Sequence, residues 1–264
     1  HRQVNELMTD YGKMDILWLD GGWVRKTTDE EVKKYLADIS EGSRWARNPQ
    51  SQDVDIPGLA AEARKKQPGL IVVDRAVPGM YQNYLTPEQH IPENGLSYPW
   101  ETCMTMANSW SYVPNDVYKP TDELIEKLVD VVSKGGNFLL NIGPSPQGTF
   151  DDSAYNRLKG IGDWMKINSE AIYNSRKYTS FSDGDTIRYT QSKDGKTLYV
   201  FLFNKPGSRV DLTKTGYQKN MKATLLGSKT RLKLEKNTQG LSITIPGNGT
   251  DQLKNVWVIK LSRE

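Results

Sequence analysis

The sequence is poor in the residues that form disulfides and metal clusters. Its 264 residues include a single cysteine, Cys103, and only two histidines, His1 and His90. One cysteine excludes an intrachain disulfide, and so few thiols and imidazoles argue against a zinc cluster or a histidine-based metal site. We therefore expect no metal site.

Long apolar runs and a strong charge of one sign are also missing. No stretch approaches the roughly 18 apolar residues that a membrane-spanning helix needs. The 35 Lys and Arg residues against 32 Asp and Glu residues give a net charge of +3, and they form no long basic run. We therefore expect neither a membrane span nor a nucleic-acid partner. The 36% hydrophobic and 25% charged residues are typical of a globular protein.

The first residues carry a helical pattern but no start signal. The chain opens with HRQVNELMTDYGKMD, without an initiator methionine or a signal peptide. Val4, Leu7 and Met8 recur at helical spacing, which predicts an amphipathic helix leading into a strand. We expect the chain to be part of a longer or processed protein.

Up to about residue 173, short apolar strands alternate with helices. The segment 26–55 is polar and rich in turn formers. Alternating strands and helices predict a parallel sheet under helices, with strands that are buried on both faces. The expected strands are 16–19, 70–73, 100–112 and 137–143, and the expected helices are 56–69, 121–136 and 155–173.

The pattern changes after this point to β-rich runs separated by turns such as KDG, KPG, TQG and PGNG. These runs predict a small antiparallel β-sandwich. Four or five strand–helix units cannot close an eight-stranded barrel by themselves. We therefore expect an α/β chain with two domains, the carboxyl-terminal half of a (β/α) barrel-type catalytic domain over residues 1–175 and a β-sandwich over 176–264.

The segment WLDGGW places a carboxylate at the end of an apolar strand. Asp20 follows the strand, Trp18 and Trp23 flank it, and Gly21 and Gly22 come directly after it. A strand-end aspartate often only caps the next helix. Two glycines, however, remove bulk beside the carboxylate, which a helix cap does not require. This segment therefore favours a functional Asp20.

Other polar side chains also follow or flank apolar strands. They include Asp74 and Arg75 after LIVV, Glu101 beside Trp100, and Asn141 within FLLNIG. In parallel α/β folds, sites form at the carboxyl ends of strands. Carboxylates among tryptophans suit a sugar, whose apolar ring faces stack on indoles. The alternative is that such pairs are buried salt bridges.

Taken together, WLDGGW, VVDR, TPEQ, PWETCMTMANSWSY and VSKGGNFLLNIGPSPQGTF resemble the retaining α-L-fucosidases of glycoside hydrolase family 29. The similarity covers nearly all of residues 1–175. Residues 178–264 resemble the family's carboxyl-terminal β-sandwich only in their pattern of β-rich runs and in their position. The resemblance implies hydrolysis of terminal α-linked L-fucose from glycans by double displacement, without a cofactor or metal.

The resemblance also assigns roles to single residues. Asp20 corresponds to the nucleophile, which attacks the anomeric carbon and forms a covalent glycosyl-enzyme. Arg75 resembles a contact to a sugar hydroxyl or to the nucleophile's carboxylate. Trp110 resembles an aromatic residue that lines the fucose pocket, and we expect Trp18 and Trp23 to bind the substrate as well.

The acid/base residue has two candidates, because its position varies within the family. Glu88 in TPEQ fits the position used by several bacterial members, and Glu101 in PWETC is its competitor. We favour Glu88, because we expect it on a mobile loop that can deliver a proton, whereas Glu101 enters a strand.

Two other functions are compatible with the sequence. One is a glycosidase of the same fold that acts on another sugar, such as a galactoside. The other is a non-catalytic carbohydrate-binding module, for which Tyr199 and Trp257 are candidates, although both are more typical of a sandwich core. The TPEQ pattern looks bacterial and favours a periplasmic or secreted protein, and the oligomeric state is left open.

Overall fold

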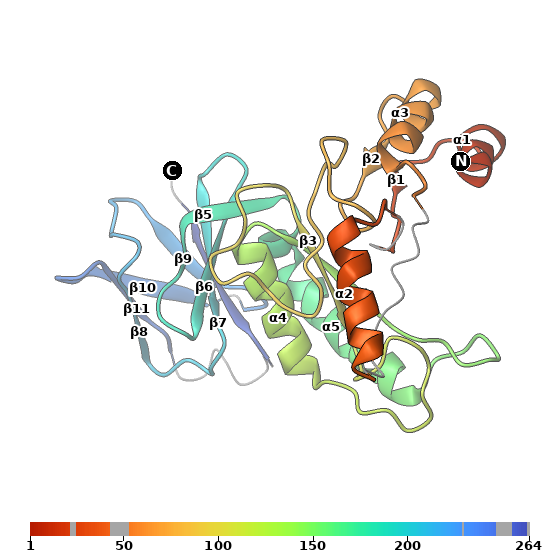
Figure 1. Cartoon of the computed structure of the whole chain (residues 1–264). Helices are drawn as coiled ribbons and strands as arrows, with labels where there is room; N and C mark the ends of the chain where they lie inside the picture. The colour runs from red at the N-terminus through yellow and green to blue at the C-terminus, as the bar shows by residue number, and fades with distance from the viewer. Residues whose placement is uncertain (22–24, 43–52, 229, 247–254, 263–264) are drawn as a thin grey trace. The chain divides into compact units, whose positions relative to one another are not determined.

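The computed structural model describes residues 1–21, 25–42, 53–228, 230–246 and 255–262. The chain divides into two compact units. The first comprises His1–Thr86 with Tyr98–Trp100, and the second comprises Pro87–Ser97 with Glu101–Glu264. The elements of each unit are coloured along the chain in Figure 1.

The first unit is built on a short parallel strand pair. Strand β1 (Ile16–Leu17) pairs with β2 (Ile71–Val72) in the register Ile16↔Ile71 and Leu17↔Val72. Helices α1 (Arg2–Asp10) and α3 (Ile56–Lys66) lie side by side next to these strands (Figure 1). Met8, Leu17, Leu59, Ala63 and Val72 belong to the apolar core that these elements share.

The prediction that the first strand is buried on both faces is wrong for the described residues. Leu17 is only 6% exposed because it packs into the core with Met8 and Leu59, whereas Ile16 is 50% exposed. Successive side chains of a strand point to opposite faces, and the described helices cover one face of this pair.

Helix α2 (Asp29–Ser40) was not expected from the polar composition of this region. It begins with a capping box, in which Thr28 Oγ1 accepts a bond from the Glu31 N–H and the Thr28 N–H donates to the Glu31 carboxylate at 2.9 Å. Two otherwise unpaired donors are thereby satisfied, which favours a helix start. The T-x-x-E spacing was the sequence signal for this helix.

The second unit begins with another parallel pair, β3 (Glu101–Thr105) and β4 (Asn137–Asn141). Helix α4 (Thr121–Ser133) connects these strands, and α5 (Asp152–Ile172) follows β4. Strand β3 ends well before residue 112, so the predicted strand 100–112 was too long.

No helix in the described part of the chain is long and apolar enough to cross a membrane.

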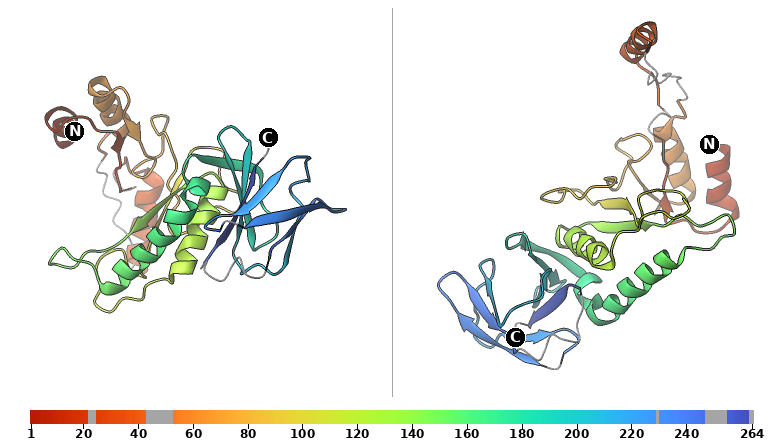
Figure 2. Two further views of the ribbon diagram at one scale, coloured as in Figure 1. Left: turned by 180° about the vertical axis from the view of Figure 1, so that it is seen from behind. Right: turned by 90° about the horizontal axis from the view of Figure 1, so that it is seen from below.

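The rest of the second unit is an antiparallel sheet that curls around its own core (Figure 2). The described residues form 8 strands in the order β5-β6-β7-β12-β9-β10-β11-β8. The strands are β5 (Ser175–Ser182), β6 (Ile187–Ser192), β7 (Thr197–Leu202), β8 (Arg209–Leu212), β9 (Lys222–Leu225), β10 (Arg231–Lys236), β11 (Leu241–Thr244) and β12 (Trp257–Ser262).

Strand β7 is buried from Leu198 to Leu202 because both of its faces are covered. Leu198 and Val200 point into the core inside the curled sheet, whereas Tyr199 and Phe201 pack with residues of α4 and α5. Trp257 packs against the core inside the sheet. Tyr199 is therefore a buried packing residue, whereas Trp257 is partly buried and also lines a hollow beside α5.

Candidate active site

The end of β1 presents an exposed carboxylate. Asp20 has a side chain that is 62% exposed, and its Oδ1 accepts a bond of 3.0 Å from the Gly21 N–H. Gly21 has φ +120°, a conformation that residues with a side chain rarely adopt. This explains one of the two glycines. Gly22 and the predicted contact Trp23 lie outside the described residues.

Three of the predicted site residues lie together in the first unit. The Nε atom of Arg75 lies 3.3 Å from Asp20 Oδ1, and its guanidinium carbon lies 5.3 Å from the centre of the Trp18 ring. The Arg75 side chain is only 15% exposed. A planar guanidinium can pair with a carboxylate and stack on an indole at the same time, which a lysine cannot do.

Thr86 was missed in the sequence, although it connects Asp74 and Arg75, which lie shortly after β2. Its hydroxyl donates to Asp74 Oδ1 at 2.6 Å, and its carbonyl accepts a 3.3 Å bond from Arg75 Nη1. Thr86 is buried, so these bonds fix the direction of the Arg75 side chain. A threonine in a loop carries no sequence signal for such a role.

Glu88 lies in the second unit, on a segment that is paired with β3. The Cys103 N–H donates to the Pro87 carbonyl at 3.0 Å, and the Gln89 N–H donates to the Cys103 carbonyl at 2.9 Å. Glu88 stands opposite Cys103 in this parallel bridge and is exposed. The segment is thus a loop whose backbone is bonded to β3, and its mobility stays a prediction.

Glu101 lies at the amino end of β3, whereas the loop that follows this strand begins at its carboxyl end. It is the first residue of β3, so about 13 Å of strand separates it from Thr105 at the carboxyl end. It lines a cavity of about 640 Å³ together with Asn137 and Lys177. This cavity extends from the amino ends of β3 and β4 along α4 and α5. Sites in parallel sheets form at the carboxyl ends of the strands, and Glu101 does not lie there.

Trp110 is attached to the carboxyl end of β4. The Asn141 amide donates to its carbonyl at 2.7 Å, and the indole is 41% exposed. Gly143 allows the loop that carries Trp110 to lie close to the end of β4, because a Cβ at this position would lie 2.5 Å from backbone atoms of Ser111 and Tyr112. The NIG sequence thus holds the segment that carries Trp110 in place.

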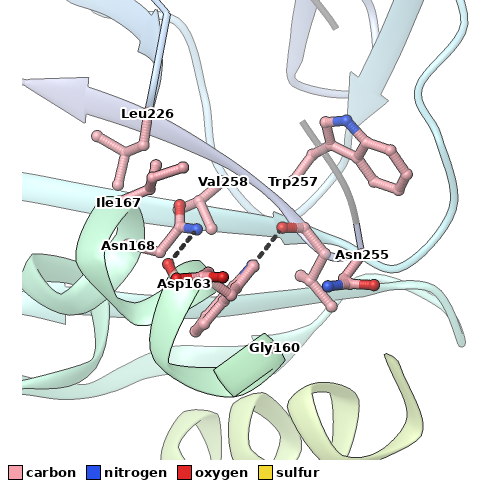
Figure 3. Close-up of a pocket in the computed structure, with 10 residues that line it drawn as sticks. Gly160, Asp163, Ile167, Asn168, Leu226, Asn255, Trp257 and Val258 are labelled. Atoms are coloured by element: carbon pink, nitrogen blue, oxygen red, sulfur yellow. Dashed lines mark hydrogen bonds between the residues drawn. The ribbon is translucent and has the colours of Figure 1, made fainter. Parts of the chain in front are cut away.

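A second hollow of about 240 Å³ lies between α5 and β12 (Figure 3). The Trp164 indole N–H donates to the Val256 carbonyl at 2.7 Å, and the Asn168 amide donates to the Trp164 carbonyl at 3.0 Å. Ile167, Leu226 and other apolar side chains form much of its wall (Figure 3). Trp257, one of the two candidates for glycan binding, is among the residues that line it, and the hollow lies where α5 packs on the sheet.

The comparisons with known proteins point to one family. The family model described as alpha-L-fucosidase matches residues 1–170, and the model described as alpha-L-fucosidase C-terminal domain matches residues 182–262. The chain belongs to the alpha-L-fucosidase family.

Individual relatives are distant but cover most of this chain. The alpha-L-fucosidase of Dictyostelium discoideum is 29% identical, over 93% of this chain and 51% of its own length. Alpha-L-fucosidase isoenzyme 1 of Paenibacillus thiaminolyticus is 25% identical, with a TM-score of 0.79 over 99% of this chain and 61% of its own. An alpha-fucosidase of Thermotoga maritima in complex with fucose is 25% identical, with a TM-score of 0.66 over 89% and 57%. The chain spans about half the length of the curated relatives it matches.

Proposed function

We propose that the protein to which this chain belongs is a retaining exo-α-L-fucosidase, which hydrolyses terminal α-linked L-fucose from glycans. The observation that carries this proposal is the exposed Asp20 carboxylate, which Arg75 and the Gly21 N–H hold at the end of β1. The family match supports the substrate, and fucose is the sugar bound in the Thermotoga maritima relative.

In the first step, Asp20 attacks the anomeric carbon of fucose. A bond forms between its carboxylate and C1 while the bond from C1 to the leaving oxygen breaks. Both contacts that the structure describes for this carboxylate, from Arg75 and from the Gly21 N–H, reach Oδ1. We propose that the attack comes from Oδ2, the oxygen other than the one that these two described contacts reach.

Glu88 acts as the acid and base in this proposal. It donates a proton to the leaving oxygen in the first step, then removes a proton from the water that attacks C1 and releases Asp20. Its exposure, on a segment beside the middle of β3, supports this choice. The place of Glu101 at the amino end of β3 speaks against the competitor.

Aromatic side chains provide the sugar contacts. Trp18 and Trp110 are partly exposed, and we propose that they and Trp23 face the ring and the C6 methyl group of fucose. A methyl group prefers an apolar surface, whereas the C6 hydroxyl of a galactoside needs a polar partner. Turnover of an aryl α-L-galactoside, which differs from the fucoside only by its C6 hydroxyl, at a similar rate would favour the alternative substrate.

The wider architecture and location are also proposals. We propose that β1 to β4 belong to the carboxyl-terminal half of a (β/α) barrel-type catalytic domain that ends near residue 175, and that residues 176–264 form a β-sandwich. We further propose a periplasmic or secreted protein.

The test is removal of the nucleophile in the protein as its gene encodes it. We expect Asp20→Ala to lose nearly all turnover of an aryl α-L-fucoside, while the control Asp15→Asn keeps it, because Asp15 pairs with Lys13 on the surface. A 2-fluoro fucosyl fluoride should label the peptide that contains Asp20, as read by mass spectrometry. Near-normal turnover by Asp20→Ala would remove the proposal.

A separate measurement decides the acid/base residue. Azide can replace the missing base when the acid/base carboxylate is removed, because it attacks the glycosyl-enzyme without giving up a proton. We expect azide to restore turnover in Glu88→Ala and to leave Glu101→Ala unchanged. Rescue of Glu101→Ala alone would reverse the assignment.

A further inference from the structure

Gln89, the residue after Glu88, has an unusual backbone. Its φ is +56°, in the left-handed region that glycine, asparagine and aspartate occupy more readily than glutamine. A residue persists in this region when its surroundings hold it there, and such positions cluster at functional sites.

Hydrogen bonds of the Gln89 side chain stabilise this conformation. Its Nε2 donates to Thr105 Oγ1 at 3.1 Å, and its Oε1 accepts a 3.3 Å bond from the Thr105 N–H. Both ends of the amide therefore contact the same residue, at the carboxyl end of β3. Together with the Gln89 N–H bond to the Cys103 carbonyl, these bonds fix the residue at three points.

Thr105 is itself a rigid anchor. It is buried, and its hydroxyl donates to the Ala107 carbonyl. Lys119 Nζ donates to the Thr105 carbonyl at 2.7 Å and to the Ala107 carbonyl at 3.0 Å. Burial lowers the pKa of Lys119. A strand end tied in this way moves little, so a side chain clamped to it moves little as well.

These bonds determine the position of Glu88. On its amino side, the Pro87 carbonyl accepts bonds from the Cys103 N–H and from the Thr102 hydroxyl. On its carboxyl side, Gln89 has a left-handed backbone, and the carbonyl of the next residue, His90, accepts a 2.7 Å bond from the Thr102 hydroxyl. The backbone of Glu88 is thus fixed on both sides, although its side chain is exposed.

We propose that Gln89 is a positioning residue for the acid/base step. By clamping the chain to Thr105, it holds the Glu88 carboxyl where it can protonate the leaving oxygen. This inference rests on the proposed function, in which Glu88 is the acid and base. In this proposal Gln89 acts only through Glu88 and has no direct part in the chemistry.

The key variant is Gln89→Asn in the protein as its gene encodes it. Asparagine accepts the left-handed backbone but is one methylene too short for the bonds to Thr105. Protonation matters most for poor leaving groups, and acid catalysis contributes about 10²- to 10⁴-fold. We therefore expect kcat/KM to fall by roughly tenfold or more for phenyl α-L-fucoside and less than about threefold for the 2,4-dinitrophenyl compound. The basic limb of the pH profile should shift.

Two further variants separate positioning from a structural role. Gln89→Glu keeps the length and the acceptor for the Thr105 N–H, so we expect it to recover part of the loss. The matched control is Gln191→Asn, which removes a hydrogen bond from the side-chain amide to the Lys177 carbonyl in the antiparallel sheet of β5 to β12, here called the β-domain. It should lower Tm without a dependence on the leaving group.

The outcomes distinguish the two proposals. Glu88→Ala should show the same dependence on the leaving group, more strongly, together with azide rescue. If Glu88→Ala behaves so but Gln89→Asn loses rate equally on both substrates, or on neither, the Gln89 inference is wrong and the proposed function stands. If Glu88→Ala shows neither sign, the assignment of Glu88 is wrong, and the role of Gln89 is wrong with it.

Discussion

Among single residues, the carboxylates of this chain differ mainly in the donors around them. Asp20 is open to solvent, whereas Asp183 in the β-domain is surrounded by donors. Asp183 accepts bonds from the Thr213 N–H at 2.6 Å, the Thr213 hydroxyl at 2.8 Å, the Tyr189 hydroxyl at 3.0 Å and the Lys214 N–H at 3.2 Å. Burial alone would raise the pKa of Asp183, but these donors outweigh it and lower the pKa.

This difference predicts a pH dependence of stability. The pKa of Asp183 is lower in the folded than in the unfolded state, so its contribution is present above the unfolded pKa and is lost as pH falls through the folded pKa. We expect Asp183→Asn to lower the free energy of unfolding by about 1 kcal/mol at pH 7, allowing for solvent screening, and by less near pH 3. Urea unfolding at both pH values checks this, with Asp185→Asn as control. An equal loss at both would contradict it.

At the scale of elements, one ionic cluster joins α4 to the β-domain. Asp130 on α4 lies 2.8 Å from Lys134 Nζ and 2.6 Å from Arg188 Nε on β6, and all three side chains are largely buried. The guanidinium of Arg188 also lies 5.1 Å from the centre of the Phe203 ring. A single carboxylate therefore compensates two buried cations.

Removal of this carboxylate leaves both cations uncompensated. We expect Asp130→Asn to lower the free energy of unfolding by about 3 kcal/mol, because an unpaired buried charge is costly. Denaturant unfolding measures the loss. The matched control is Asp163→Asn, whose carboxylate also lies between two lysines, Lys159 and Lys166, but on the surface of α5. Equal effects of the two variants would show that burial is not the cause.

The loop after β4 gives a second prediction at this scale. A Cβ on Gly143 would lie 2.5 Å from backbone atoms of Ser111 and Tyr112, so Gly143→Ala must push the segment that carries Trp110. Since small displacements at a site are costly, we expect kcat/KM for an aryl fucoside to fall roughly tenfold or more. Gly162→Ala in α5 is the control, because its Cβ would meet nothing within 4 Å. Unchanged kinetics of Gly143→Ala would show that the segment does not serve the site.

For the molecule as a whole, the proposed mechanism makes a stereochemical prediction. Double displacement inverts C1 twice and requires carboxyl groups about 5–5.5 Å apart. We expect the first product to be α-L-fucose, which then mutarotates, and NMR of the early reaction records it. Methanol should yield the α-methyl fucoside. Initial release of the β-anomer would exclude Asp20 as a covalent nucleophile.

The sequence predicted those parts of the fold that depend on local patterns. Parallel strands under helices followed by an antiparallel β-domain could be read from apolar periodicity and turn residues. The helix at Asp29–Ser40 was missed because its polar composition outweighed the capping signal of Thr28 and Glu31. The burial of Ile16 was overestimated, because periodicity does not say how many layers cover a strand.

The sequence by itself supplied the chemical groups of the proposed site, since WLDGGW, TPEQ and SWSY contain the carboxylates and indoles that the proposal uses. Only the tertiary structure decided how they are held. Arg75 contacts Asp20 across 55 residues of sequence, and Gln89 is clamped to Thr105 at the end of another strand. Such bonds join segments that are far apart along the chain, so no local pattern encodes them. The physical reason is that packing, and not periodicity, fixes which strand ends meet.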